Sequence, residues 1–575
     1  ARGAGSQNQI REPGSKGCAR LYLGRPRPAH HEWISLKENY FAAKDLFYIL
    51  PVSLVLGAWL ASIQQGSFFS GFLSFFFVFL LSLVLLRIAH NWSGGAKTLG
   101  YIVAMAFFVR LAVGVTLHMA LPIYGHDDVD DRGGYVYTDA HKRDDQAWAL
   151  ATSDRSTLDA FSEKYASDQY GGLLAFNALI YRYLSPDAQR PLMLVLFSAF
   201  FAAMGVPFLW KAVNQIFGEH VAWASAWIFG LYPESILLGA SAMREPYLLT
   251  FSALALWGFV NFGLQEPISA LGSKPSDSKK TWIWLALGLL GMLLVSPVVA
   301  LVTIVILGGW VFFTKENREI SWKGLLAVAV IFIVGLFLLS ASLNRSGEFD
   351  TTSPLHVIND WMKIAVRMNV DEIESGSGWV QKIFDEGPTW IRMPFIAIYG
   401  IFQPVLPATV IHPTKLIWTI IGFLRGLGWY ALLPLLILSF LAATSQESRK
   451  TRNLVLWLSL LVMLWVLLAA LRGGADLYDN PRYRTILFLW QAVLAGYVWV
   501  WRRETRNPWF TRVVLMEILF LVVFTQWYAS RYYHWGGQLS FPIMIALILG
   551  LWGIVLGIGW WQDRESARKQ AKRRA

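Results

Sequence analysis

Acidic side chains gather between residues 121 and 190, a polar stretch flanked by long apolar runs. A run of about 20 apolar residues is long enough to cross a bilayer, so this stretch is predicted to be a loop at a membrane surface. Ionisable groups collected at a membrane edge mark sites of catalysis or cation binding. The carboxylates between residues 121 and 145 are Asp127, Asp128, Asp130, Asp131, Asp139, Asp144 and Asp145.

The composition identifies the class of protein that carries this loop. Of 575 residues, 55% are hydrophobic and 15% are charged, whereas soluble domains carry about 25% charged residues. These fractions indicate a polytopic membrane protein. Its single cysteine excludes an internal disulfide and a cysteine zinc cluster.

About fourteen apolar runs approach or reach the length of a membrane span. The segment 393–413 is apolar but contains four prolines, which predicts an interfacial or re-entrant segment rather than a straight span. The runs lie at 47–64, 67–88, 99–120, 190–213, 220–240, 246–264, 281–297, 298–313, 324–343, 415–443, 453–471, 485–501, 509–529 and 540–560.

Seven regions follow from these runs. They are a polar basic tail (1–45), three spans (46–120), an outer catalytic loop with juxtamembrane helices (121–190), further spans (191–343), an outer loop with an interfacial segment (344–414), C-terminal spans (415–562) and a basic cytoplasmic tail (563–575).

Basic connectors follow alternate runs, at 315–323, 449–452 and 502–506. Because positively charged connectors stay inside, both termini are predicted to be cytoplasmic in a plasma-membrane protein. The net charge of +12 has the same explanation, so nucleic acid is not an expected partner. The segments predicted to share the outer face are 121–190, 344–392, 472–484 and 531–538.

The pair Asp144–Asp145 is predicted to begin a helix, because acidic residues suit the positive end of a helix. Trp148 and Ala151 give this helix an apolar stripe that can lie on the membrane. A second amphipathic stretch occupies 156–165, and the apolar run 173–184 is too short to span. The pattern predicts interfacial helices that hold an acid pair at the membrane surface.

This acid pair, followed by an aromatic residue and an alanine at the start of the first large outer loop, resembles the GT-C glycosyltransferases. Within them it is most similar to the protein mannosyltransferase-like branch, which includes the bacterial lipid A aminoarabinose transferases. Two further passages agree in order and membrane side, Leu231–Ser235 followed by Ser241–Pro246, and Asn480–Arg484 before a span. The resemblance covers about residues 100–500. It implies an all-α, GT-C-like fold with interfacial helices in an outer loop, to which the apolar runs give about fourteen transmembrane helices.

The chain departs from the family pattern in two respects. Two spans precede the one before the loop, and the loop opens with the extra acidic run Asp127–Asp131. These departures leave the choice of catalytic aspartate open.

Enzymes of this family move a sugar from a polyprenyl-phosphate lipid to an acceptor hydroxyl or amine. The resemblance implies the same donor here, among membrane lipids, with a protein, a lipid or a glycan as the unidentified acceptor. Such a reaction requires a general base near the acceptor. Asp144 is the favoured base and Asp145 the next candidate, while Asp139 and Asp127–Asp131 remain alternatives. As a purely structural alternative, Asp144 is a helix-end charge in a solvated loop.

The leaving phosphate requires fixed positive charge. Arg244, Arg482 and Arg484 lie just outside spans on the predicted outer side, and Arg425 is an intramembrane cation. In the purely structural alternative, Arg244 pairs with Glu245, whereas Arg482 and Arg484 are interfacial anchors beside Tyr483. The predicted substrate-binding residues are Arg244, Glu245, Arg482, Tyr483, Arg484, Arg425 and Asp139.

Asp128 and Asp130 stand two residues apart before Gly133, as in a calcium loop, but Arg132 occupies a position that needs an oxygen ligand. A divalent cation at Asp128 and Asp130 is therefore weighed against a solvated acidic turn, and no other cofactor is expected. Two other functions compete. Polymerases or ligases of surface polysaccharide carry their large loop late in the chain, and transporters place charges near the midplane in related halves.

The predicted topology is testable by cysteine labelling of Ser156→Cys and Lys450→Cys. A membrane-impermeant thiol reagent added from outside should label the first variant, because the 121–190 loop is outside, and spare the second. The parent chain, with its native Cys18, is the control. Labelling of Lys450→Cys from outside would contradict the assigned sidedness.

Overall fold

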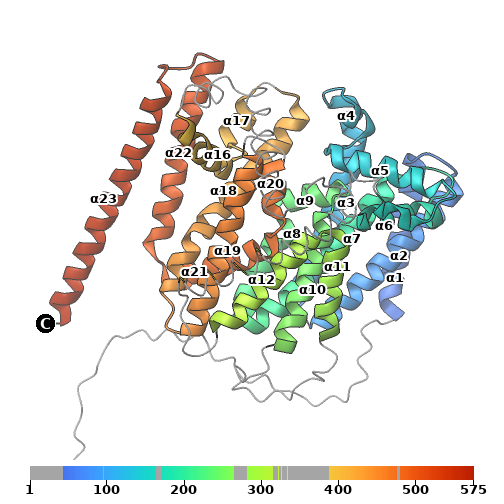
Figure 1. Cartoon of the computed structure of the whole chain (residues 1–575), viewed down its shortest axis with the longest axis horizontal. Helices are drawn as coiled ribbons and strands as arrows, with labels where there is room; N and C mark the ends of the chain where they lie inside the picture. Colours follow the sequence, from blue (N-terminus) through green and yellow to red (C-terminus); the bar gives the residue numbers. More distant parts are fainter. Residues whose placement is uncertain are drawn as a thin grey trace, which may run out of the picture. The chain divides into compact units, whose positions relative to one another are not determined.

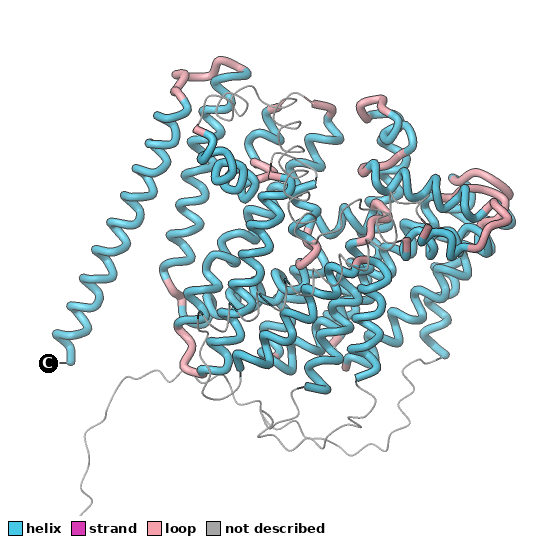
Figure 2. The backbone as a smooth tube through the Cα atoms, in the orientation of Figure 1, coloured by secondary structure: helices cyan, strands magenta, loops and turns pink. Residues whose placement is uncertain are grey.

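A computed structural model describes residues 43–94, 96–162, 171–263, 282–314, 388–412, 414–474 and 479–574, with four isolated positions between 322 and 333. Every regular element within these ranges is a helix (Figures 1 and 2), so the expected all-α polytopic fold is confirmed. The predicted N-terminal tail up to residue 42, the loop at 344–387 and nearly all of the run at 324–343 lie outside the described residues, and α1 already includes the last three residues of the predicted tail.

Nine helices in the described ranges are long and apolar enough to cross a membrane. The count becomes ten if α8 and α9, which meet at 46°, form one bent span. The nine are α1 (Ala43–Ile63), α2 (Phe68–Ser93), α3 (Lys97–Tyr124), α7 (Pro191–Phe217), α12 (Pro297–Thr314), α18 (Leu416–Thr444), α19 (Arg449–Gly473), α22 (Pro508–Tyr532) and α23 (Phe541–Arg574).

The other predicted runs with described residues are also helical. They form α8 (Glu219–Leu231), α9 (Pro233–Ala240), α10 (Glu245–Gly263), the short α11 (Trp282–Val295) and α21 (Phe488–Thr505). The proline-rich segment 393–413 falls in α16 (Thr389–Phe402) and the six-residue α17 (Leu406–Ile411). Its prolines therefore prevent a single straight span, as predicted.

The acid-rich loop folds into four short elements, α4 (Val129–Gly133), α5 (Thr138–Ala151), the 3₁₀ turn η1 (Thr157–Phe161) and α6 (Gly172–Leu184). The prediction that a helix begins at Asp144 is wrong, because α5 begins at Thr138 and places Asp139 in its first turn. Asp144 therefore lies in the middle of the helix. The predicted helix at 156–165 is reduced to η1, with residues from 163 onward outside the description.

The break between α8 and α9 is stabilised by an arginine from another span. Pro233 starts α9 and has no N–H, so carbonyls at the end of α8 lose their helical partners. Arg110 of α3 is buried and supplies the missing donors. Its guanidinium donates to the carbonyl of Gly230 at 2.8 Å and to the carbonyl and hydroxyl of Ser235 at 3.3 and 2.9 Å.

Contacts between distant segments bring several predicted outer loops together at one end of the helices. Asp139 of α5 pairs with Arg482 of α20 (Asp479–Thr485) at 2.7 Å. His126 Nε2 lies 3.1 Å from Thr414 Oγ1, next to α18. In Figure 1, α20 lies beside α9, with which it makes contact. The first loop is thus built against the C-terminal half of the chain.

Replacement of Arg110 by methionine should lower the free energy of unfolding by about 2–4 kcal/mol, because buried carbonyls at the α8–α9 break lose their donors. Thermal unfolding in detergent measures the loss. Arg87→Met is the matched control, since Arg87 makes a partly exposed pair with Asp45 at 3.1 Å and such pairs contribute about 1 kcal/mol or less. Equal losses in the two variants would refute this role of Arg110.

Candidate functional site

Asp144 is the buried carboxylate of the acid-rich loop. Its residue is 2% exposed, and its two oxygens accept hydrogen bonds from the hydroxyls of Tyr135 and Tyr181. Tyr135 precedes α5 and Tyr181 lies on α6, so these bonds join the two short helices around the carboxylate. Burial raises the pKa of Asp144 to about 6, although the tyrosine hydroxyls oppose that rise.

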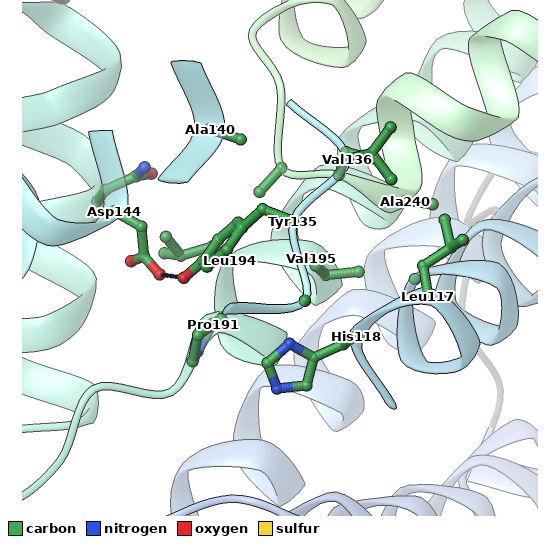
Figure 3. Close-up of a pocket in the computed structure, with 15 residues that line it drawn as sticks. Leu117, His118, Tyr135, Val136, Ala140, Asp144, Pro191, Leu194, Val195 and Ala240 are labelled. Atoms are coloured by element: carbon green, nitrogen blue, oxygen red, sulfur yellow. Dashed lines mark hydrogen bonds between the residues drawn. The ribbon is translucent and has the colours of Figure 1, made fainter. Parts of the chain in front are cut away.

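A pocket lies directly beside this carboxylate (Figure 3). The space inside it that a water-sized group can occupy is about 20 Å³. Its wall is formed by α3, the α4–α5 link, α5, α6, α7 and the end of α9. The polar residues in this wall include Asp144, Tyr135, His118, Asn177 and Ser241, and most of the other lining residues are apolar.

Asp145 occupies a different environment from Asp144. Its side chain is 61% exposed, and it does not line this pocket. Gln189 donates to Asp145 Oδ1 at 3.1 Å, and His141 Nε2 lies 3.6 Å from Asp145 Oδ2. Of the two adjacent carboxylates, only Asp144 is placed to meet a group inside the pocket.

The acidic run at the start of the loop builds local structure. Asp128 caps α4 by accepting from the Asp131 amide at 2.7 Å. Asp130 accepts from Thr138 at 2.5 Å and lies 2.7 Å from His141 Nδ1. Asp131 is buried and accepts from the indole of Trp418 at 3.0 Å.

These contacts bear on the candidate cation site at Asp128 and Asp130. Among the residues that the structure describes, no group of three His, Cys, Asp or Glu side chains is arranged to hold a metal ion. Both carboxylates already accept hydrogen bonds from protein groups.

An ionic cluster connects α5 to α10 and α20. Arg482 donates to Asp139 at 2.7 Å, and its Nε lies 3.5 Å from Glu245 Oε1. Arg244 Nε lies 3.7 Å from the same oxygen. Glu245 is fully buried, whereas the Asp139 side chain is about half-exposed. Burial raises the pKa of Asp139, but the charge and hydrogen bond of Arg482, with Arg143 and Arg244, bring it below its usual value.

A second ion pair anchors the segment before α5. Arg425 of α18 donates to both oxygens of Glu234 on α9, at 2.5 and 3.1 Å. Both residues are buried, and the Tyr137 hydroxyl donates to Glu234 Oε1 at 3.2 Å. Tyr137 is the N-cap residue, directly before α5 begins at Thr138. The Glu234–Arg425 pair is held in place because removing either member would leave the other as an uncompensated buried charge. Its hydrogen bond from Tyr137 therefore fixes the start of α5.

The remaining predicted phosphate ligands point elsewhere. Arg484 donates to the carbonyls of Ile401, at 3.2 Å, and Gln403. Its guanidinium lies 3.8 Å from the centre of the Trp429 ring. The Tyr483 ring lies 5.4 Å from the Arg482 guanidinium carbon. Arg482 and Arg244 thus belong to the cluster at α5, whereas Arg484 supports the end of α16.

Sequence reasoning did not identify four of the residues that form this site, namely Tyr135, Tyr181, His118 and Asn177, and it included Glu234 only as part of the passage Leu231–Ser235. The only available signal was for His118 and Asn177, polar residues inside runs that are otherwise apolar. The tyrosines carry no such signal, because tyrosine is common at membrane interfaces.

Comparisons with known proteins add little to this description. No family model matches the chain, and no curated protein does. Among solved structures, the archaeal oligosaccharyltransferase AglB from Archaeoglobus fulgidus, in complex with an inhibitory peptide and a dolichol-phosphate, matches with 12% sequence identity and a TM-score of 0.34. The match covers 79% of this chain and 54% of that chain, so it spans about half of the AglB structure.

The two tyrosine hydroxyls are expected to lower the pKa of Asp144. Tyr135→Phe and Tyr181→Phe each remove a donor that favours ionised Asp144, so the carboxyl pKa should rise further above about 6. If Asp144 is the general base that the sequence predicts, it acts when ionised, and the acidic limb of the pH profile of kcat/KM should move to higher pH by about one unit. Tyr183→Phe is the control, since Tyr183 is on the same helix and exposed. A shift of the limb to lower pH would contradict this role.

Proposed function

We propose that this protein is a membrane glycosyltransferase of the GT-C type. It transfers a sugar from a polyprenyl-phosphate-linked donor to an acceptor at the outer face of the plasma membrane, with Asp144 as the general base. The observation that carries the proposal is the environment of Asp144. A buried carboxylate with a pKa of about 6, held in the wall of a pocket, is suited to accept a proton near neutral pH.

In the proposed reaction, Asp144 removes the proton of the acceptor as its oxygen or nitrogen bonds to the anomeric carbon of the sugar. The bond between that carbon and the phosphate oxygen breaks, and the polyprenyl phosphate leaves with the electron pair. The proton remains on Asp144 until solvent removes it. The tyrosine hydroxyls hold the carboxylate in position throughout.

Arg482, with Arg244, is the proposed binding site for the leaving phosphate. Arg482 contacts the helix that carries Asp144, and a guanidinium can bind two phosphate oxygens while it stays protonated. Asp139 and Glu245 orient the two arginines through the contacts described above.

The order of the sequence motifs supports the same conclusion. The three passages that resemble GT-C enzymes are far apart in the chain, and two of them meet around α5. Arg244–Glu245 comes from the second passage and Arg482 from the third, and both touch the ionic cluster.

The proposal is tested with the full-length protein in lipid nanodiscs and a panel of polyprenyl-phosphate monosaccharides, with released polyprenyl phosphate as the readout. Asp144→Asn should reduce turnover by about 10²–10⁴-fold, the usual contribution of a general base. Asp145→Asn, the matched neighbour, should change turnover only a few-fold. Arg482→Ala should raise the donor concentration needed for half-maximal turnover. Full activity of Asp144→Asn, or no release from any donor by the unmodified protein, would refute the proposal.

Stability distinguishes loss of the base from misfolding. Burial raises the folded-state pKa of Asp144 from 3.8 to about 6, so the folded protein holds this proton more tightly than the unfolded chain does. The ionised carboxylate therefore lowers stability above pH 6, and this cost disappears below pH 4. Asp144→Asn should accordingly be more stable than the parent at pH 8, by roughly 1–3 kcal/mol.

A further inference from the structure

Arg482 is held by two carboxylates that differ in their access to solvent. Its Nη2 donates to Asp139 Oδ2 at 2.7 Å, and its Nε lies 3.5 Å from Glu245 Oε1. The Asp139 side chain is 47% exposed, whereas the Glu245 side chain is fully buried. An anion that approaches Arg482 from outside the protein therefore reaches the Asp139 side of the guanidinium.

The two contacts also differ in how easily they can be broken. A half-exposed carboxylate that leaves a guanidinium is solvated by water, so such a contact contributes little to stability. A fully buried carboxylate has no water to replace its partner, and separating the two leaves an uncompensated charge. Arg482 can therefore exchange Asp139 for another anion while Glu245 stays in place.

Glu245 keeps two arginines positioned during such an exchange. The Nε atoms of Arg482 and Arg244 lie 3.5 and 3.7 Å from the same oxygen, Glu245 Oε1. Because these atoms remain beside the buried oxygen, the Nη2 of Arg482 is the group that changes partner when Asp139 leaves. A phosphate suits that position, since a guanidinium binds carboxylate and phosphate oxygens in the same geometry.

Asp139 also ties down the helix that carries Asp144. It lies in the first turn of α5, while Ala140 and Asp144, one turn apart, line the pocket on a neighbouring side of the helix. The 20 Å³ of water-sized space in that pocket holds roughly one water molecule. A larger group reaches Asp144 only after α5 or its neighbours move, and the solvent-accessible contact between Asp139 and Arg482 opposes a movement of α5.

We propose that Asp139 is an internal competitor for the donor phosphate. The phosphate takes the place of the Asp139 carboxylate on Arg482, and this exchange releases the first turn of α5 before an acceptor reaches Asp144. Asp139 is thus a positioning residue that acts through Arg482. The inference rests on the proposed function, because it assigns how the phosphate site is filled and what filling it does to α5.

The first test measures the binding of farnesyl phosphate, a short prenyl phosphate, to the full-length protein in phosphatidylcholine nanodiscs. Asp139→Asn should bind it about 2–5-fold more tightly than the parent, the fold-change that corresponds to losing one exposed ion pair. Arg482→Ala should bind it about tenfold less tightly or worse. If Asp139 only held Arg482 in place, its replacement would weaken binding, so weaker or unchanged binding by Asp139→Asn would overturn the proposal.

Two variants control for charge and for the side chain itself. Asp139→Glu restores a charged competitor and should reverse the gain in affinity. Asp154→Asn removes one negative charge from an exposed position just beyond α5 and should keep the parental affinity. An equal gain in affinity in either control would show that Asp139 does not compete specifically, and would overturn the proposal.

The second test follows α5 by hydrogen exchange in a peptide covering residues 138–144. Farnesyl phosphate should speed the exchange of these amides by about 2–5-fold in the parent, because the contact that holds the first turn is lost. Asp139→Asn should exchange faster without ligand and respond little to it. A ligand that only packs against α5 would slow the exchange, so slower exchange in the parent would overturn the release of α5.

Inorganic phosphate and farnesol separate the two parts of the probe. Farnesol lacks the phosphate and should leave the exchange of α5 unchanged. Inorganic phosphate lacks the chain and should act only at much higher concentration than farnesyl phosphate. Equal potency of inorganic phosphate would identify a site for free phosphate, and an effect of farnesol equal to that of farnesyl phosphate would exclude an exchange of anions. Either result would overturn the proposal.

The two proposals fail in different ways. If Asp139→Asn binds farnesyl phosphate more tightly and the exchange of α5 rises, but no sugar donor is turned over, the phosphate exchange stands and the glycosyl transfer fails. If turnover depends on Asp144 but Asp139→Asn binds farnesyl phosphate less tightly, the inference about Asp139 fails alone.

Discussion

A charged carboxylate removed from water at the edge of a membrane is the constraint on which this structure depends. An isolated carboxylate in such a place would simply stay protonated. Two tyrosine hydroxyls restore part of the lost solvation of Asp144, and they bring its pKa to about 6 instead of a still higher value. The pKa of Asp144 is therefore set by two opposing effects, desolvation by burial and hydrogen bonding by the tyrosines.

Two sets of tertiary contacts hold helix α5 in the position that keeps Asp144 buried beside its tyrosine donors. Tyr137 ties its start to the buried Glu234–Arg425 pair, and Asp139 ties its first turn to Arg482 and Glu245. Isolated short helices are marginal in water, so these tertiary contacts decide where α5 lies. The break between α8 and α9, stabilised by Arg110, is what places Glu234 within reach of Tyr137.

The lengths of the apolar runs predicted a helical membrane protein and the position of most helices, because a span must be both apolar and helical to cross lipid. The same rule isolated the acid-rich loop, and the sequence pattern selected Asp144 within it. The predicted start of α5, at Asp144, was wrong by six residues, because the acid pair was taken as the N-terminal end of the helix. The helix begins earlier because Tyr137 and Asp139 contact Glu234 and Arg482, which lie far away in the sequence. A contact such as that between Glu234 and Arg425, which are 191 residues apart, cannot be predicted from the spacing of residues in a single sequence.

The tie between Asp139 and Arg482 also has a consequence for biosynthesis. The two residues are 343 positions apart, and ribosomes add about 5–20 residues per second. The loop therefore emerges roughly 20–70 s before its arginine partner has been made. During that interval α5 lacks the contact that fixes its first turn, and the nascent chain holds an incomplete site. The cluster that holds the first turn of α5 is therefore complete only after the last third of the chain has been made.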